Sequence, residues 1–144
     1  MNFRLETAKK FSLAYRQVCR PLCRELGLPQ TAFDILMFLG NNPAYKTARD
    51  IVEMRRIKAN LVSVHVDRLV REGYLERQQV PGDRRKTLLL CTDKAQPVIA
   101  KGRLLQEDFF EKLLDGMDEE ERNAFSAALH RIGENLDAIL EEET

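Results

Sequence analysis

Three cations cluster at the start of a predicted helix, where a helix usually carries the opposite charge. Arg55, Arg56 and Lys58 precede or open the helix that we expect over residues 58–72. The amides of a helix N-terminus carry partial positive charge, so Ser, Thr, Asp or Asn caps and acidic neighbours are preferred there. Cations at that position are unfavourable unless an anion is bound nearby. Because phosphate oxygens fit such a position, the pattern predicts a polyanionic partner.

The next turns of the same helix offer side chains that can read DNA bases. Asn hydrogen-bonds well to adenine, Ser tolerates several bases, and Val can contact a thymine methyl group. We therefore expect the outer face of this helix to lie in a major groove. The DNA contacts expected on it are Asn60, Ser63, Val64 and Arg68, with Asp67 also facing outward. The alternative is a surface helix that carries its cations by chance.

A second group of cations lies at the tip of a predicted hairpin. Residues 74–80 and 86–91 have the composition of strands, and a Pro-Gly-Asp turn lies between them. A hairpin tip is narrow enough to enter a minor groove, whose negative potential attracts Arg. We expect Asp83 to hold the guanidinium of Arg85 in a bidentate pair. The DNA contacts expected at this tip are Asp83, Arg84, Arg85 and Lys86. A soluble turn with no ligand is the alternative.

The elements that would position these residues follow from apolar periodicity and from helix stop signals. Pro21 and the Gly27-Leu28-Pro29 run are expected to end the first helix, and Thr47 is expected to cap the third, with Asp50 in its first turn. The two short helices before the hairpin have the spacing of a helix-turn-helix. The expected helices span residues 5–22, 30–39, 58–72, 98–114 and 119–140, with a short third helix between the Thr47 cap and a break near residues 55–57. The fold class is therefore mainly α (α+β), a winged helix-turn-helix with a two-stranded wing and long dimerisation helices.

The last two helices carry apolar faces that a small DNA-binding lobe cannot cover. In the first of them Val98, Leu105, Phe109 and Leu113 are expected to point inward. The stripe on the final helix consists of Phe125, Ala128, Leu129, Ile132, Leu136, Ile139 and Leu140. Packing against a second copy about a two-fold axis would bury these faces. We therefore expect a homodimer, with a DNA-binding lobe over residues 29–95 and a dimerisation lobe over residues 1–28 and 96–144.

Charge is distributed unevenly along a chain whose net charge is zero. Residues 46–90 hold eleven Lys/Arg against six Asp/Glu, a balance of +5. Residues 106–144 hold three against thirteen, a balance of −10. A basic middle beside an acidic end indicates one face for a polyanion and another for solvent.

The run from Ser63 to Ala95 resembles the MarR family of bacterial transcriptional regulators. The matching segments are Ser63-Val64-His65-Val66-Asp67-Arg68-Leu69, Glu72-Gly73-Tyr74-Leu75-Glu76-Arg77, Asp83-Arg84-Arg85 and Leu88-Leu89-Leu90-Cys91-Thr92-Asp93-Lys94-Ala95. This resemblance implies a dimer on pseudo-palindromic double-stranded DNA, usually a repressor. It also implies a crevice for a ligand, which we expect to be a small aromatic or anionic effector. Val64, Cys91 and Ala95 depart from the family pattern, and Pro97 indicates that the fifth helix either is kinked or begins near Gln96.

Cys19 and Cys23 lie four residues apart and share one face of the first helix. Buried packing is the expected role, since free Cys is among the most buried residue types. An oxidant-sensing repressor that uses Cys19 and Cys23 is a competing hypothesis, because nearby arginines can lower a thiol pKa. The sequence is also compatible with a cysteine redox enzyme, and with a winged-helix dimer used only for protein assembly.

Other classes of function have little support in the sequence. His65 and His130 lie 65 residues apart, without Cys or carboxylates at ligand spacing, so we expect no metal site. The scattered glycines form no phosphate-cradling loop, and no catalytic motif stands out, so we expect neither a cofactor nor an enzyme. The odd number of cysteines and the lack of a long apolar run predict a cytoplasmic protein with no membrane segment.

Overall fold

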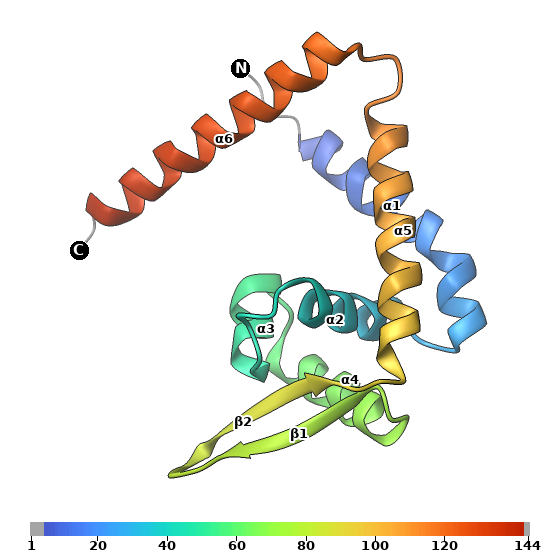
Figure 1. Cartoon of the computed structure of the whole chain (residues 1–144), viewed down its shortest axis with the longest axis vertical. Coiled ribbons are helices and arrows are strands. Elements are labelled where there is room, and N and C mark those ends of the chain that lie inside the picture. Colours follow the sequence, from blue (N-terminus) through green and yellow to red (C-terminus); the bar gives the residue numbers. More distant parts are fainter. Residues whose placement is uncertain (1–4, 143–144) are drawn as a thin grey trace. The chain divides into compact units, whose positions relative to one another are not determined.

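The computed structural model describes residues 5–142 (Figure 1). The elements follow the predicted order of four helices, a hairpin and two further helices, which confirms the winged helix-turn-helix class. The helices are α1 (Leu5–Leu26), α2 (Gln30–Asn41), α3 (Ala48–Arg55), α4 (Ala59–Arg71), α5 (Ala95–Leu113) and α6 (Glu119–Glu142), and the strands are β1 (Leu75–Val80) and β2 (Asp83–Cys91).

The chain forms two compact units, one reaching to Glu107 and the other beginning at Asp108. The boundary falls inside α5, which begins at Ala95 and so close to the expected Gln96. Pro97 is the third residue of this helix, where a missing N–H removes no intrahelical hydrogen bond. The division into a DNA-binding lobe over residues 29–95 and a dimerisation lobe stays a prediction.

The core of the first unit is built around α2, which is buried along most of its length. Ile51 of α3 and Leu69 of α4 are fully buried in the same cluster. The α5 helix approaches α2 closely, because a Cβ on Gly102 would overlap the sulfur of Met37. The loop before α3 joins the hairpin, since the backbone N–H of Leu89 donates to the carbonyl of Lys46 at 2.6 Å. These contacts fix the helices and the hairpin of this unit to one core.

The first helix continues past Pro21, so the expectation that Pro21 ends it was wrong. A single proline removes one backbone hydrogen bond, and the buried side chains of Cys19, Leu22 and Cys23 on both sides of it keep α1 packed. The helix ends at Gly27, whose φ of +66° is the left-handed conformation that favours glycine. The N–H groups of Gly27 and Leu28 donate to the carbonyls of Arg24 and Cys23, which completes a Schellman cap.

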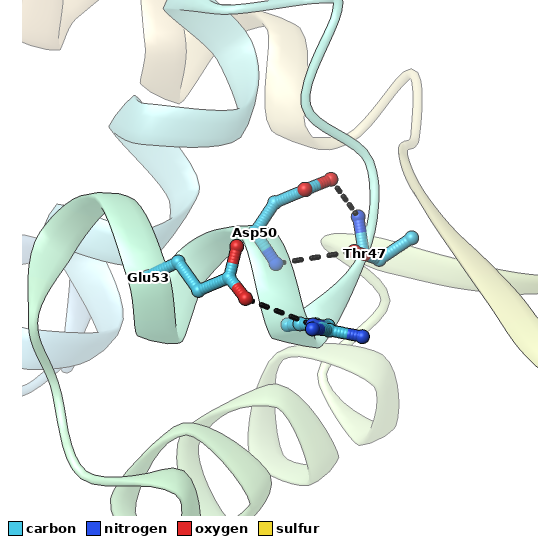
Figure 2. A network of polar contacts seen from close by, with 4 residues as sticks. Thr47, Asp50 and Glu53 are labelled. Atoms are coloured by element: carbon cyan, nitrogen blue, oxygen red, sulfur yellow. Dashed lines mark hydrogen bonds and ion pairs between the residues drawn. The ribbon is translucent and has the colours of Figure 1, made fainter. Parts of the chain in front are cut away.

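A capping box begins α3 (Figure 2). The Thr47 hydroxyl accepts from the backbone N–H of Asp50 at 3.1 Å, and the Asp50 carboxylate accepts from the N–H of Thr47 at 3.1 Å. A third residue of the network, Glu53, accepts a hydrogen bond from Arg49 at 2.8 Å. The predicted cap is therefore confirmed, and it is stronger than expected because both residues contribute.

The wing is a two-stranded antiparallel hairpin, drawn at the lower edge of Figure 1. β2 begins at Asp83, three residues earlier than predicted, and only Pro81 and Gly82 form the turn. Gln79 pairs with Thr87, but the next residue, Val80, pairs with Asp83. Residues 84–86 therefore bulge out of the ladder without partners on β1. Composition does not specify strand register, so the cations expected at the tip of the hairpin lie instead in this bulge beside the turn.

The second unit consists of the end of α5, a short turn and α6. Asp118 and Glu121 cap α6 reciprocally, the carboxylate of Asp118 accepting from the N–H of Glu121 at 2.8 Å. Phe109 is buried as expected, whereas Leu113 is exposed in the single chain, so its inward position in a dimer stays a prediction. In the single chain the apolar stripe of α6 is exposed, from Phe125 through Leu140.

Candidate nucleic-acid interface

The outer face of α4 carries the predicted base-reading residues. Val62, Val66 and Leu69 pack that helix onto the core. Because these residues recur every three or four positions, the intervening side chains of Asn60, Ser63 and Val64 are exposed. The exposed fraction of Val64 is 61%, a large value for an apolar side chain at the centre of an amphipathic helix.

The start of α4 has no side-chain cap, as the sequence predicts. Lys58 is the N-cap residue and makes no capping hydrogen bond, and no acidic residue lies in the first turn. The orphan N–H groups of this turn and the helix dipole together favour a bound anion. Arg56, just before it, adopts the left-handed conformation at φ +52° and closes the turn between α3 and α4.

Arg55 lies near the same turn but is directed toward the core side. Its guanidinium is 3.9 Å from the carboxylate of Asp34 on α2. Burial raises the pKa of Asp34, while a hydrogen bond from Gln30 and the positive charges of Arg55 and Arg16 lower it, and the net direction is upward. Arg55 thus balances a partly buried carboxylate in addition to its predicted role at the DNA face.

The wing cations are exposed in the bulge of β2. Asp83 accepts a hydrogen bond from the backbone N–H of Arg85 at 3.0 Å. The expected pair between Asp83 and the Arg85 guanidinium is therefore corrected to a backbone contact. This contact holds the bulge in shape, as short Asp side chains do in turns. Within residues 5–142 the guanidinium of Arg85 has no carboxylate partner, so it remains available to an external anion. Arg84 and Lys86 are likewise exposed.

Arg68 differs from the other predicted DNA contacts because it has two partners inside the chain. It donates to the backbone carbonyl of Gly27 at 2.6 Å and to Glu72 at 3.2 Å. These contacts tie α4 to the turn between α1 and α2. The partner of Asp67 was also missed: Arg77 of β1 donates a hydrogen bond to its carboxylate, which joins the wing to α4. The four-residue spacing of Arg68 and Glu72 is visible in the sequence, whereas no local pattern predicts the contact of Arg68 with Gly27 or of Arg77 with Asp67.

The two cysteines of α1 are buried, and Cys19 has no exposed surface. Burial raises the pKa of Cys19, and burial together with the nearby Cys19 thiol raises the pKa of Cys23 to about 11. A thiolate is therefore disfavoured at both positions, and the environment is that of packing residues rather than reactive thiols.

Metal and membrane sites receive no support from the part of the chain that the structure describes. Across residues 5–142 no three His, Cys, Asp or Glu side chains gather as metal ligands. Over the same residues no helix is long and apolar enough to span a bilayer.

Comparison with known proteins shows which family this chain resembles. Residues 26–86 match the sequence model of the MarR family. The fold agrees with many solved MarR structures, among them a putative MarR family regulator from Listeria monocytogenes complexed with 26mer DNA, which is 22% identical with a TM-score of 0.79. That similarity covers 94% of this chain and 90% of the Listeria chain. Over residues 26–86 the chain is therefore similar to the MarR family. All eleven predicted DNA contacts, from Arg55 to Lys86, lie inside the matched segment.

Two further proteins are similar to this chain over most of their length. The HTH-type transcriptional regulator BilQ of Clostridium symbiosum is 22% identical over 122 residues, 85% of this chain and 84% of BilQ. The uncharacterized HTH-type transcriptional regulator YdgJ of Bacillus subtilis is 26% identical over 113 residues, 78% of this chain and 68% of YdgJ. The resemblance seen in the wing and recognition-helix motifs is thus confirmed at the level of the family.

Proposed function

We propose that this chain is a DNA-binding transcriptional regulator of the MarR type that binds a pseudo-palindromic site in duplex DNA as a homodimer. The observation that carries the proposal is the exposed face of α4, which presents base-reading side chains beside an uncapped, cationic N-terminus. The related Listeria protein was solved with DNA, which supports the same partner class here. We place this activity in the cytoplasm and assign no enzymatic step to the chain.

In this proposal α4 enters the major groove and its N-terminus contacts the phosphate backbone. Lys58 and Arg56 flank that N-terminus, so their charges and the orphan amides act on the same phosphates. Ser63 and Val64 meet base edges, and the Val64 methyl groups favour a thymine. The wing bulge lies over the flanking minor groove, where Arg85 inserts and Arg84 contacts the backbone.

The homodimer is proposed from the apolar stripe of α6. Exposed fractions along it range from 44% at Phe125 to 66% at Leu140, too much apolar surface for a helix facing water on all sides. A second copy related by a two-fold axis would cover this stripe with the same residues. The two copies of α4 would then meet successive major grooves about 34 Å apart.

The regulatory direction is proposed as repression relieved by a small aromatic or anionic effector. A dimer bound across a promoter excludes polymerase, and an effector that binds the DNA-free form better shifts the population away from DNA. The raised pKa values of Cys19 and Cys23 favour a bound effector over thiol oxidation as the signal.

Footprinting on the DNA upstream of the protein's own gene tests the DNA-binding proposal. The expected result is protection of two half-sites about one helical turn apart, with weaker and strongly salt-dependent binding to random duplex. The matched variant is Ser63→Ala combined with Val64→Ala. It should lose the preference for the two half-sites over random duplex but still bind random duplex. Absence of any duplex binding at low salt would contradict the proposal and support a role in protein assembly.

A further inference from the structure

A cavity of about 530 Å³ lies beside the second half of α1. Its walls come from α1, the turn between α1 and α2, the start of α2 and one residue of α4. Four of the described residues that line it are arginines, Arg16, Arg20, Arg24 and Arg68, and none is Asp or Glu. The volume is in the range of small-molecule sites.

Helix geometry explains why three of these arginines gather. Arg16, Arg20 and Arg24 are spaced by four residues, so they share one face of α1. Like charges at this spacing repel one another, which makes the arrangement unfavourable without a counterion. Asp34 lowers part of this repulsion through its interaction with Arg16. Within residues 5–142 Arg20 and Arg24 form no ion pair.

A second, independent feature of the cavity also favours an anion. Pro29 and Gln30 line it, and they are the N-cap and first residue of α2. Pro29 provides no side-chain cap, and α2 has no acidic residue in its first turn. The orphan N–H groups and the dipole of this helix therefore lack a negative partner at the same place where the arginines converge.

We propose that this cavity binds a small anion that carries two or more negative charges on phosphate groups. Planar guanidinium groups match phosphate oxygens in bidentate pairs, and a helix N-terminus adds backbone donors. Arg68 is paired with Glu72 and Arg16 interacts with Asp34, so within residues 5–142 Arg20 and Arg24 supply the positive charge that is left for a ligand. None of the described residues that line the cavity is aromatic, so it offers no stacking surface for an aromatic acid. The ligand class is therefore multiply charged phosphate, which is narrower than the small aromatic or anionic effector expected above.

Arg68 connects this site to the proposed DNA-reading helix. Its guanidinium holds the carbonyl of Gly27 at 2.6 Å, and its backbone belongs to α4. A phosphate that draws this guanidinium into the cavity weakens the link between α4 and the α1–α2 turn. Bound phosphate should then weaken DNA binding, and DNA should weaken phosphate binding by the same factor. This consequence rests on the proposed function, whereas binding of the anion itself does not.

Calorimetric titration of the full chain with sodium pyrophosphate, without DNA, tests the site. The variant is Arg20→Gln combined with Arg24→Gln, since both side chains are exposed and their loss leaves the core intact. The matched control is Lys9→Gln with Lys10→Gln, which removes the same charge from exposed positions of α1 that do not line the cavity. We expect one saturable site per chain, weakened about tenfold or more in the arginine variant and unchanged in the lysine variant. Benzoate at the same concentration should bind more weakly than pyrophosphate.

The outcomes separate this inference from the proposed function. A lack of saturable pyrophosphate binding, or equal affinity in the arginine variant, overturns the inference and leaves the footprinting result untouched. The inference is also overturned if the parent binds no pyrophosphate and the arginine variant loses DNA affinity. The arginines would then contact the DNA backbone and not a small anion. If pyrophosphate binds as expected but no DNA is bound, the site stands and the regulatory consequence fails.

Discussion

Arg77 on the first wing strand donates a hydrogen bond to the carboxylate of Asp67 on α4, so the wing and the proposed reading helix are joined by one ion pair. Both side chains are about half exposed. An exposed pair of this kind stabilises the fold by about 1 kcal/mol or less. Its larger effect should be on geometry, because it fixes where the wing lies relative to α4.

We expect Arg77→Ala to change the unfolding free energy little and to weaken DNA binding several-fold. Exchanging the two residues, Asp67→Arg with Arg77→Asp, should recover part of the affinity if the pair acts by positioning. The control is Lys101→Ala, which breaks a comparably exposed pair with Glu25 in the same unit. Urea titration and duplex binding measure the two effects. DNA affinity equal to that of the parent in Arg77→Ala would show that the pair does not position the wing.

Arg56 provides a test in which stability and DNA affinity should move in opposite directions. Its φ of +52° is unfavourable for a residue with a side chain, and glycine adopts it freely. Arg56→Gly should therefore stabilise the fold by about 1 kcal/mol while it removes a proposed phosphate contact. Thermal melts and DNA binding at two salt concentrations measure both. Greater stability with unchanged DNA affinity would remove Arg56 from the interface.

Asp34 predicts a pH dependence of stability. Burial raises its pKa above the ordinary value of 3.8, so the folded chain holds this proton more tightly than the unfolded chain. Its contribution to stability is fully present below the ordinary value and is lost as the pH rises through the raised pKa. The unfolding free energy of the parent relative to Asp34→Asn should therefore fall as the pH rises above about 4. A difference that is constant or increases with pH would contradict this assignment.

Local signals in the sequence predicted local structure well. The Thr47 cap, the stop at Gly27 and the missing cap at Lys58 each depend on residues within one helical turn, and all three are present. The expectation that Pro21 ends α1 failed because the packing of buried side chains outweighs the one hydrogen bond that proline removes. The exposure of the α4 face also followed from periodicity, since Val62, Val66 and Leu69 alone define its buried side.

Relationships between distant residues could not be predicted in the same way. Arg68 and Gly27 are 41 residues apart, and only the packed fold brings the guanidinium to that carbonyl. The wing bulge depends on a register shift between Gln79 and Val80 that no composition rule specifies. The cationic cavity needs α2 and α4 beside α1, although the spacing of its three α1 arginines was visible in the sequence.

The α6 stripe predicts the oligomeric state. Leu129→Glu should yield monomers or insoluble protein, because it places an unpaired charge in the proposed dimer interface. Ala127→Glu adds the same charge to an exposed position of α6 away from the stripe and should leave the dimer unchanged. Light scattering on size-fractionated protein measures the mass. A stable, soluble dimer of Leu129→Glu would mean that the chains pair through another surface.

The most direct test of the DNA-binding proposal is the salt dependence of duplex affinity for the parent and for Arg85→Ala. Asp83 holds the backbone of the bulge through the Arg85 N–H, which alanine retains, so this variant removes only the free guanidinium. We expect a loss of about 1–3 kcal/mol per contact and a salt slope lower by about one for each wing. Arg84→Ala should weaken DNA binding less than Arg85→Ala does. Lys112→Ala, on the acidic C-terminal half, should leave DNA affinity unchanged. Identical affinities of Arg85→Ala and the parent at every salt concentration would contradict the proposed role of the wing.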